Sequence, residues 1–276
     1  MPSFDLSDAA ILAYAWGLAA AGFLLALWPL SVALRDASVV DFWWGPGMAL
    51  MAVAAWVLAG SPMGAHALAA AGLVTVWGLR LGAALGARRM REAHEDPRYQ
   101  ELRRAWDPGF WWKSLFVVFA LQALLQGLVA LGALWTVLTP ASPAGGLWLA
   151  GVIAAAAGLT VEAAADRQLD RFKTAAGATS GALCRDGLRA YVRFPHYAGE
   201  IVFWVGIALI ALDAGLWWAP APAALIAALL IKVSGAPMLE EHLERTRPDY
   251  AAWAAETPAF VPRIAALRAA ARRAIG

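Results

Sequence analysis

The sequence contains little charge and almost no cysteine. Charged residues make up 15% of its 276 residues, whereas hydrophobic residues make up 61%. The single cysteine, Cys184, excludes an intramolecular disulfide. No C-x-x-C or H-x-x-x-H spacing is present, which argues against a metal site, and no G-x-G-x-x-G stretch occurs, which argues against a Rossmann-type cofactor site. Any cofactor must therefore be held by helices and loops.

Long apolar runs accompany this scarcity of charge. A chain of this length with a mean hydropathy of +0.59 is too apolar for a soluble domain. Runs of about 17 to 25 residues are long enough to cross the hydrocarbon layer as helices. We expect an all-α polytopic membrane protein with seven transmembrane helices, near residues 9–34, 39–58, 64–85, 111–138, 145–162, 197–212 and 215–231. If the last two short runs form one hairpin, the number is six.

Lysine and arginine are absent from every second connection between these runs. By the positive-inside rule, the N-terminus lies outside and the C-terminus lies in the cytoplasm, which requires an odd number of spans and favours seven. The first run lacks a basic leader and a small-residue cleavage site, so we expect a retained helix and no signal peptide. We expect no nucleic-acid partner, because the basic residues are those that orient a membrane protein. We expect one domain, 1–276, with cytoplasmic loops at about 87–110, 163–196 and 232–262.

Four ionisable residues fall at the predicted cytoplasmic ends of the apolar runs: Asp41, Arg80, Glu162 and Glu200. Ionisable groups inside hydrocarbon are costly, face the protein interior and are functional candidates. We therefore expect them to converge on one cavity, unless they are interfacial residues that reach headgroup water. The sequence GPG at 45–47 predicts a break in the second span, because proline removes a backbone donor there. Glycines 78, 82 and 86 predict a face on which another helix packs closely.

Three polar segments on the predicted cytoplasmic side can build a site. Residues 88–107 predict a salt-bridged helix pair broken at Pro97, or a charged interfacial loop. Asp166, Asp170 and Lys173 share one helical face, with Arg167 and Arg171 on the next. His196, Tyr197 and Glu200 fall within one turn of a helix start, where free amides favour an anion. The last segment is EEHLER at 240–245, which a solvated charged helix explains equally well. We expect an anion and ribose site at the membrane surface.

At these residues the sequence resembles the steroid 5α-reductase C-terminal family, and most closely its bacterial branch of multi-pass proteins of unassigned function. The motifs that carry the resemblance are DFWWG at 41–45, HEDPRY at 94–99, EAAADRQLDRFK at 162–173, GLRAYVRFPHYAGE at 187–200 and DYAAWAAETPAFVP at 249–262. The resemblance implies a reductase in a bacterial inner membrane that binds NADPH from the cytoplasm. It would deliver hydride to the activated C=C bond of an apolar substrate, such as a steroid-like lipid, that enters from the bilayer.

The resemblance also implies site residues. Asp41 takes the place of an acidic second-span residue that holds the substrate carbonyl, and is the expected catalytic residue. The expected cofactor-binding residues are Asp166, Arg171, Lys173, His196, Tyr197, Glu200, His242 and Arg245. The steroid reductases use a third-span tyrosine, and this sequence has none there. Asp41 would then act alone as a protonated acid.

Two other functions compete with the reductase. The isoprenylcysteine carboxyl methyltransferases share the proline-aromatic-x-x-glutamate stretch and an acidic helix, and bind S-adenosylmethionine. A reductase must also hold a 2′-phosphate, for which the chain offers five cations: Arg167, Arg171, Lys173, Arg189 and Arg193. This favours NADPH. A non-enzymatic scaffold is the third possibility, but it would give the acidic residues Asp41 and Glu200, which are expected to be buried, no function.

Overall fold

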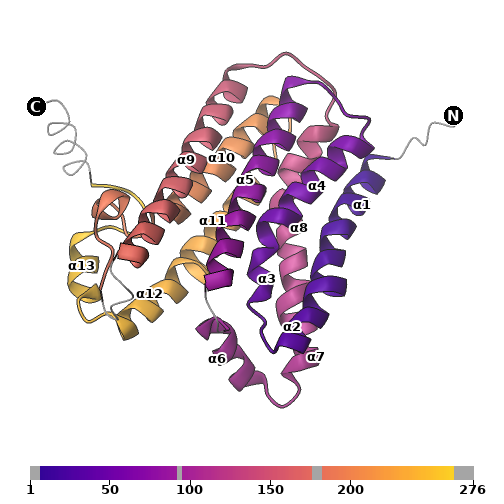
Figure 1. Ribbon diagram of the computed structural model, residues 1–276. Helices are drawn as coiled ribbons and strands as arrows, with labels where there is room; N and C mark the ends of the chain where they lie inside the picture. Colours follow the sequence, from indigo (N-terminus) through magenta and orange to yellow (C-terminus); the bar gives the residue numbers. More distant parts are fainter. Residues whose placement is uncertain (1–6, 92–94, 176–181, 264–276) are drawn as a thin grey trace, which may run out of the picture. The chain divides into compact units, whose positions relative to one another are not determined.

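The structure is a computed structural model that describes residues 7–91, 95–175 and 182–263. The chain divides into two compact units, and Figure 1 labels their helices. The first comprises Met1–Val152 with Gly206–Ala223, and the second comprises Ile153–Val205 with Ala224–Gly276. Every regular element in the described part is a helix, which agrees with the all-α prediction.

The helices, in chain order, are α1 (Asp8–Ala21), α2 (Trp28–Leu34), α3 (Val39–Phe42), α4 (Trp44–Leu58), α5 (Ala65–Arg91), α6 (Pro97–Trp106), α7 (Phe110–Ser114), α8 (Leu121–Leu138), α9 (Gly146–Ala175), α10 (Pro195–Asp213), α11 (Pro220–Ala228), α12 (Ala236–Thr246) and α13 (Tyr250–Glu256). π-helical turns at Gly22–Leu27, Leu115–Ala120 and Leu229–Val233 join α1 to α2, α7 to α8 and α11 to α12, and a 3₁₀ turn covers Gly187–Ala190.

Seven helical stretches of the described chain are long and apolar enough to cross a membrane, as predicted. They cover Asp8–Leu34, Val39–Leu58, Ala65–Met90, Phe110–Leu138, Gly146–Ala175, Pro195–Asp213 and Pro220–Thr246. The fifth runs well past its predicted end at 162, because residues 163–175 contain good helix formers and no glycine or proline. The seventh starts five residues later than predicted, because Gly215 has a positive φ of 91° and Pro220 fits the first helical turn.

The second span is interrupted, but the break lies at Trp43 and not at the predicted 45–47. Trp43 separates α3 from α4, and its carbonyl accepts a hydrogen bond from Gly47 N at 2.8 Å. Pro46 thus lies in the first turn of α4, where a missing N–H costs little. The side-chain amide of Gln126 donates to the carbonyls of Trp43 (3.1 Å) and Trp44 (2.9 Å). The buried polar backbone at the break is therefore hydrogen-bonded to α8.

Helices α4 and α5 touch through their backbones, as the glycine face predicted. A Cβ atom on Gly45 would lie 2.2 Å from the Gly78 carbonyl oxygen and 2.7 Å from Gly82 N. A Cβ atom on Gly82 would lie 2.6 Å from Pro46 Cγ. Real Cβ atoms do not approach other atoms this closely, so only glycine permits the contact. The glycine pattern thereby sets the distance between the second and third spans.

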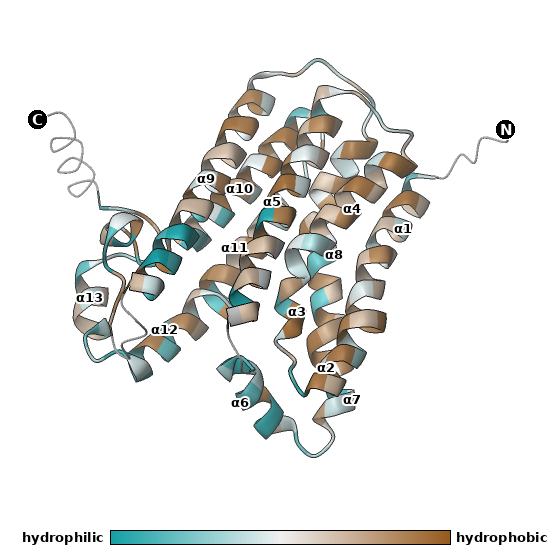
Figure 2. Ribbon diagram, viewed as in Figure 1, coloured by the Kyte–Doolittle hydropathy of each residue, from teal (hydrophilic) through white to brown (hydrophobic). Residues whose placement is uncertain are grey.

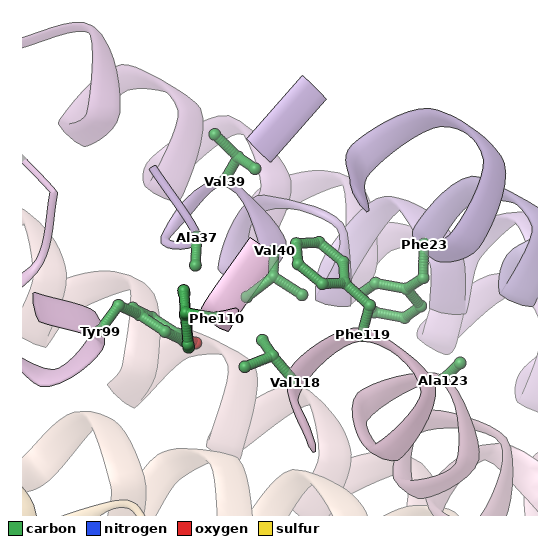
Figure 3. Packing of buried hydrophobic residues seen from close by; sticks show 9 residues of the cluster. All are labelled: Phe23, Ala37, Val39, Val40, Tyr99, Phe110, Val118, Phe119 and Ala123. Atoms are coloured by element: carbon green, nitrogen blue, oxygen red, sulfur yellow. The ribbon is translucent and has the colours of Figure 1, made fainter. Parts of the chain in front are cut away.

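A buried apolar cluster in the first unit surrounds the start of α3 (Figure 3). Its members come from the first span, α3, α6 and α7–α8: Phe23, Ala37, Val39, Val40, Tyr99, Phe110, Val118, Phe119 and Ala123. Tyr99 is the one member with a polar tip, and only 8% of its surface is exposed. Its ring is packed among apolar neighbours, so its hydroxyl position is fixed by the core.

Candidate functional site

Asp41 is the centre of a polar cluster in the first unit. Its Oδ1 atom accepts a hydrogen bond from Tyr99 Oη at 2.6 Å, and its Oδ2 atom accepts one from Arg98 Nη2 at 2.9 Å. Two donors, one of them a guanidinium, are what a carboxylate accepts. In the sequence, Asp41 was the single expected acid, with no tyrosine beside it in the third span. It has a tyrosine partner, which comes from α6 and not from the third span.

The EDPRY part of the HEDPRY motif explains why α6 presents Tyr99 and Arg98 together. Asp96 is the N-cap of α6 and accepts from Arg98 N at 3.0 Å, and Pro97 is the first helical residue. Asp96 Oδ1 also accepts from Arg98 Nε at 2.9 Å. Consecutive residues of the first turn therefore reach Asp41 side by side.

The charges of this cluster stabilise one another. Burial disfavours the charged form of Arg98, but Asp96 and Asp41 outweigh it and raise the pKa of Arg98 above its ordinary value. Burial opposes ionisation of Asp96 too, yet the hydrogen bonds and charge of Arg98 lower the pKa of Asp96. Burial, followed by the charge of Asp41, raises the pKa of Tyr99 well above its ordinary value. Tyr99 is thus a neutral phenol that donates its proton to a carboxylate.

Ion pairs anchor α6 to the chain that leads into α3. Glu95 Oε1 accepts from Ala37 N and from Arg103 Nη2, each at 2.8 Å. Asp36 forms an ion pair with Arg89 of α5 and accepts from Ser38 N at 2.9 Å. Of the salt bridges expected within residues 88–107, Arg98–Asp96 and Arg103–Glu95 are present, and Pro97 is the first residue of α6. These ion pairs keep α6, and with it Tyr99, next to Asp41.

The predicted cofactor-binding residues belong to the second unit. Asp166, Arg171 and Lys173 lie on α9, where Asp166 is half-buried and the two cations are exposed. His196, Tyr197 and Glu200 lie half-buried in the first two turns of α10, which starts at Pro195. The rings of His196 and Tyr197 stack with centroids 4.0 Å apart. Figure 2 shows hydrophilic residues gathered on the last turns of α9 and on α12.

Helices α9 and α10 are in backbone contact. A Cβ atom on Gly199 would lie 2.7 Å from the Gly158 carbonyl oxygen and 2.8 Å from Glu162 N. Glu162 is buried, with 3% of its surface exposed. The contact brings the helix of Asp166 and the helix of Glu200 together.

A cavity of about 350 Å³ lies beside the last turns of α9. It is lined by Gln168, Arg171, Phe172, Ala175, Cys184, Asp186 and Gly187. Arg171 is the predicted cofactor-binding residue among them. His242 and Arg245 lie on α12, where exposed Arg245 pairs with Glu241 at 3.6 Å. The structure thus divides the nine predicted site residues: Asp41 is in the first unit and the other eight are in the second.

Two of the five cations expected to hold a 2′-phosphate are used inside the protein. Arg189 is 5% exposed and donates from Nη1 to the Ala165 carbonyl at 3.0 Å, and burial lowers the pKa of its guanidinium. Arg193 donates from Nη1 to the carbonyls of Ala254 (2.8 Å) and Thr257 (3.0 Å), and its Nη2 pairs with Glu240. The expectation that these two arginines bind phosphate is corrected, because both satisfy buried carbonyls. The other three expected cations, Arg167, Arg171 and Lys173, lie on α9 and are exposed.

Replacing Arg193 by alanine should lower the free energy of unfolding by about 3 kcal/mol, because two carbonyls and Glu240 lose their donor. The side chain is only 13% exposed, so water does not replace it fully. Arg185→Ala is the matched control, because Arg185 is 45% exposed and lies 3.7 Å from Asp249. It should change stability by no more than about 0.5 kcal/mol. Thermal unfolding in detergent measures both, and equal effects would contradict the role given to Arg193.

The seven apolar helices and the buried polar clusters define an integral multi-pass membrane protein. A family model described as "Protein of unknown function (DUF1295)" matches residues 27–257, and the chain belongs to this family. No curated protein and no solved structure matches the chain. The matched segment contains every predicted site residue, from Asp41 to Arg245.

Tyr99 is the functional candidate that sequence reasoning missed. The steroid reductases have their tyrosine in the third span, whereas Tyr99 follows that span by nine residues. The available signal was the HEDPRY motif, in which a capping aspartate precedes a proline, an arginine and a tyrosine. Such a cap places the tyrosine in the first turn of a helix, but its partner across the fold is not visible in the pattern.

Proposed function

We propose that the protein is a membrane-embedded reductase that uses NADPH to reduce an activated C=C bond, conjugated to a carbonyl, in an apolar lipid. The observation that carries the proposal is the 2.6 Å hydrogen bond between Tyr99 and Asp41. Reduction of an enone needs hydride at the β-carbon and a proton donor near the carbonyl oxygen, where negative charge develops. Transfer of a methyl group to a carboxylate needs no such donor. An acid paired with a carboxylate therefore favours the reductase.

The proton can be supplied by the pair in one concerted step. Asp41, 30% of whose side chain is exposed, takes up a proton from solvent hydronium, which leaves water. It passes this proton to Tyr99 Oη while Tyr99 gives its own proton to the carbonyl oxygen of the substrate. Asp41 is then a carboxylate that accepts from Tyr99 and Arg98, which is the arrangement described above. One proton and one hydride are consumed, so the added atoms balance.

The second unit contains residues that could bind NADPH, and bound NADPH would supply the hydride. Exposed Arg171 and Lys173 can pair with phosphates. The stacked rings of His196 and Tyr197 offer a surface for a planar group, and Asp166 and Glu200 can accept from ribose hydroxyls. His242 and Arg245 of α12 complete the proposed set. The apolar substrate would enter from the bilayer, and the protein would reside in a bacterial inner membrane with its C-terminus in the cytoplasm.

A methyltransferase that uses S-adenosylmethionine is the second candidate. The specific observation in its favour is that Arg189 and Arg193 bind backbone carbonyls, which removes two of five cations from the proposed phosphate site. S-Adenosylmethionine carries no phosphate, so the remaining acidic and aromatic groups of α9 and α10 suit it as well. The two candidates therefore differ in what Arg171 and Lys173 must do.

Cofactor titration separates these candidates. In detergent, NADPH should raise the unfolding temperature at lower concentrations than NADH or S-adenosylmethionine, because ligand binding stabilises the folded state by mass action. Arg171→Gln should weaken NADPH by about tenfold and leave NADH nearly unchanged. Arg185→Gln, in the same unit, is the control and should change neither. Stronger stabilisation by S-adenosylmethionine would favour the methyltransferase, and no stabilisation by any of the three would end the enzyme proposal.

A further inference from the structure

The side chain of Gln122 also touches the Tyr99 hydroxyl, and a tryptophan determines how the Gln122 amide is oriented. Gln122, the second residue of α8, donates from Nε2 to Tyr99 Oη at 3.1 Å. Its Oε1 atom accepts from the indole N–H of Trp44. An indole nitrogen can donate but cannot accept. The oxygen of the Gln122 amide must therefore face Trp44, and its NH₂ group must face Tyr99.

The direction of every hydrogen bond in the chain follows from that constraint. Because Tyr99 Oη accepts from Gln122, its own hydrogen points to Asp41. Arg98 occupies the other oxygen of Asp41 and, like the indole, can only donate. With Asp41 ionised, the chain therefore runs one way, from Trp44 through Gln122 and Tyr99 to Asp41, and protonation of Asp41 reverses only its bond with Tyr99. The group at each end of the chain, the Trp44 indole or the Arg98 guanidinium, can donate a hydrogen bond but cannot accept one.

We propose that Gln122 is a positioning residue that sets the direction of the Tyr99 hydroxyl and stabilises it when it loses its proton. This inference rests on the proposed reductase function. As Tyr99 gives its proton to a substrate carbonyl, partial negative charge develops on its oxygen in the transition state, and the N–H of Gln122 is already directed at that oxygen. A preorganised donor of this kind stabilises developing charge without rearrangement. The amide also keeps Asp41 as the group from which Tyr99 is reprotonated.

Gln126, one turn further along α8, provides a matched control. It is fully buried, and its amide donates to the backbone carbonyls of Trp43 and Trp44. Its role is therefore structural, while Gln122 binds only side chains. Gln122→Met keeps the length of the side chain and removes both hydrogen bonds. Gln122→Glu keeps its shape, but an ionised carboxylate can only accept, so Tyr99 loses its donor.

Raman spectroscopy of the tyrosine ring tests the direction without substrate or cofactor, because the ring doublet reports whether a phenol accepts or donates hydrogen bonds. The signal of Tyr99 is isolated by subtracting the spectrum of Tyr99→Phe. We expect Gln122→Met and Gln122→Glu to remove the acceptor contribution, and Gln126→Met to leave it unchanged. Trp44→Phe, which frees the amide of Gln122 to turn over, should weaken it. An unchanged Tyr99 signal in the folded Gln122 variants, or in Trp44→Phe if those variants do not fold, would overturn the proposal.

A kinetic measurement adds the functional arm. With NADPH and cholest-4-en-3-one as an apolar enone probe, Gln122→Met should lower kcat by about tenfold and leave the KM for NADPH unchanged. Gln126→Met, at equal folded fraction, should keep kcat. A wild-type protein that does not turn over the probe counts against the proposed function alone, because the Raman result stands without it. A normal kcat in Gln122→Met together with normal turnover by the wild type would overturn the positioning role.

Discussion

Replacing Gly45 by alanine should lower the free energy of unfolding by at least about 3 kcal/mol, because the new methyl group has no space. It would lie 2.2 Å from the carbonyl oxygen of Gly78 and 2.7 Å from Gly82 N. Both are backbone atoms of α5, so no side chain can rotate away, and α4 and α5 must separate. The separation would also disturb the break at Trp43 and the hydrogen bonds that Gln126 makes there.

Gly72→Ala is the matched control for this substitution. Gly72 lies in the middle of α5, and a Cβ atom on it meets nothing within 4 Å. Alanine is favoured over glycine inside a helix by about 0.8–1 kcal/mol, so stability should rise slightly or stay the same. Unfolding in detergent, monitored by circular dichroism, measures both variants. Similar stabilities for the two would show that α4 and α5 do not touch as described.

Replacing Tyr99 by phenylalanine should lower the reductase turnover number by about 10²–10⁴, the usual contribution of a general acid. Phenylalanine keeps the packing of the apolar cluster in Figure 3 and removes only the hydroxyl. Binding of NADPH should be unchanged, since the proposed cofactor residues belong to the second unit. The measurement is turnover of an enone with NADPH, together with an NADPH titration.

The control and a second variant make this test specific. Tyr14→Phe removes a hydroxyl from a residue that is 59% exposed and should have no effect on turnover. Asp41→Asn should lower turnover about as much as Tyr99→Phe, because an amide cannot pass a proton to Tyr99. The double variant should be no worse than either single one, since the two groups act as a unit. Full turnover in Tyr99→Phe would refute the assignment of the proton donor.

Local patterns were sufficient for the spans and for the glycine contacts. Apolar runs of fixed length predicted seven helices, and the second span was located residue by residue at 39–58. The repeat of Gly78 and Gly82 predicted a close helix contact, which α4 fills. These features depend on hydropathy and side-chain volume, which are properties of consecutive residues. The N-terminus outside and the C-terminus in the cytoplasm remain predictions from charge.

Such local patterns could not predict which residues distant in sequence contact one another. Tyr99 and Asp41 are 58 positions apart, and only the packing of α6 against α3 brings them within 2.6 Å. Arg193 was expected to bind phosphate because it is cationic and close to the proposed site. Its carbonyl partners, Ala254 and Thr257, are 61 and 64 positions away. Whether a cation is available to a ligand depends on which acceptors the fold places beside it.

The sequence by itself determined that this is a helical protein of seven spans, because burying the backbone in hydrocarbon leaves an apolar run of this length few other structures. It also identified Asp41 and the α9–α10 residues as the polar positions worth attention. The tertiary structure alone decided that the side chain of Asp41 lies between Tyr99 and Arg98, and that Gln122 donates a hydrogen bond to that tyrosine. The reason is that hydrogen-bond direction depends on which donors and acceptors meet in space, and a linear pattern contains no such information.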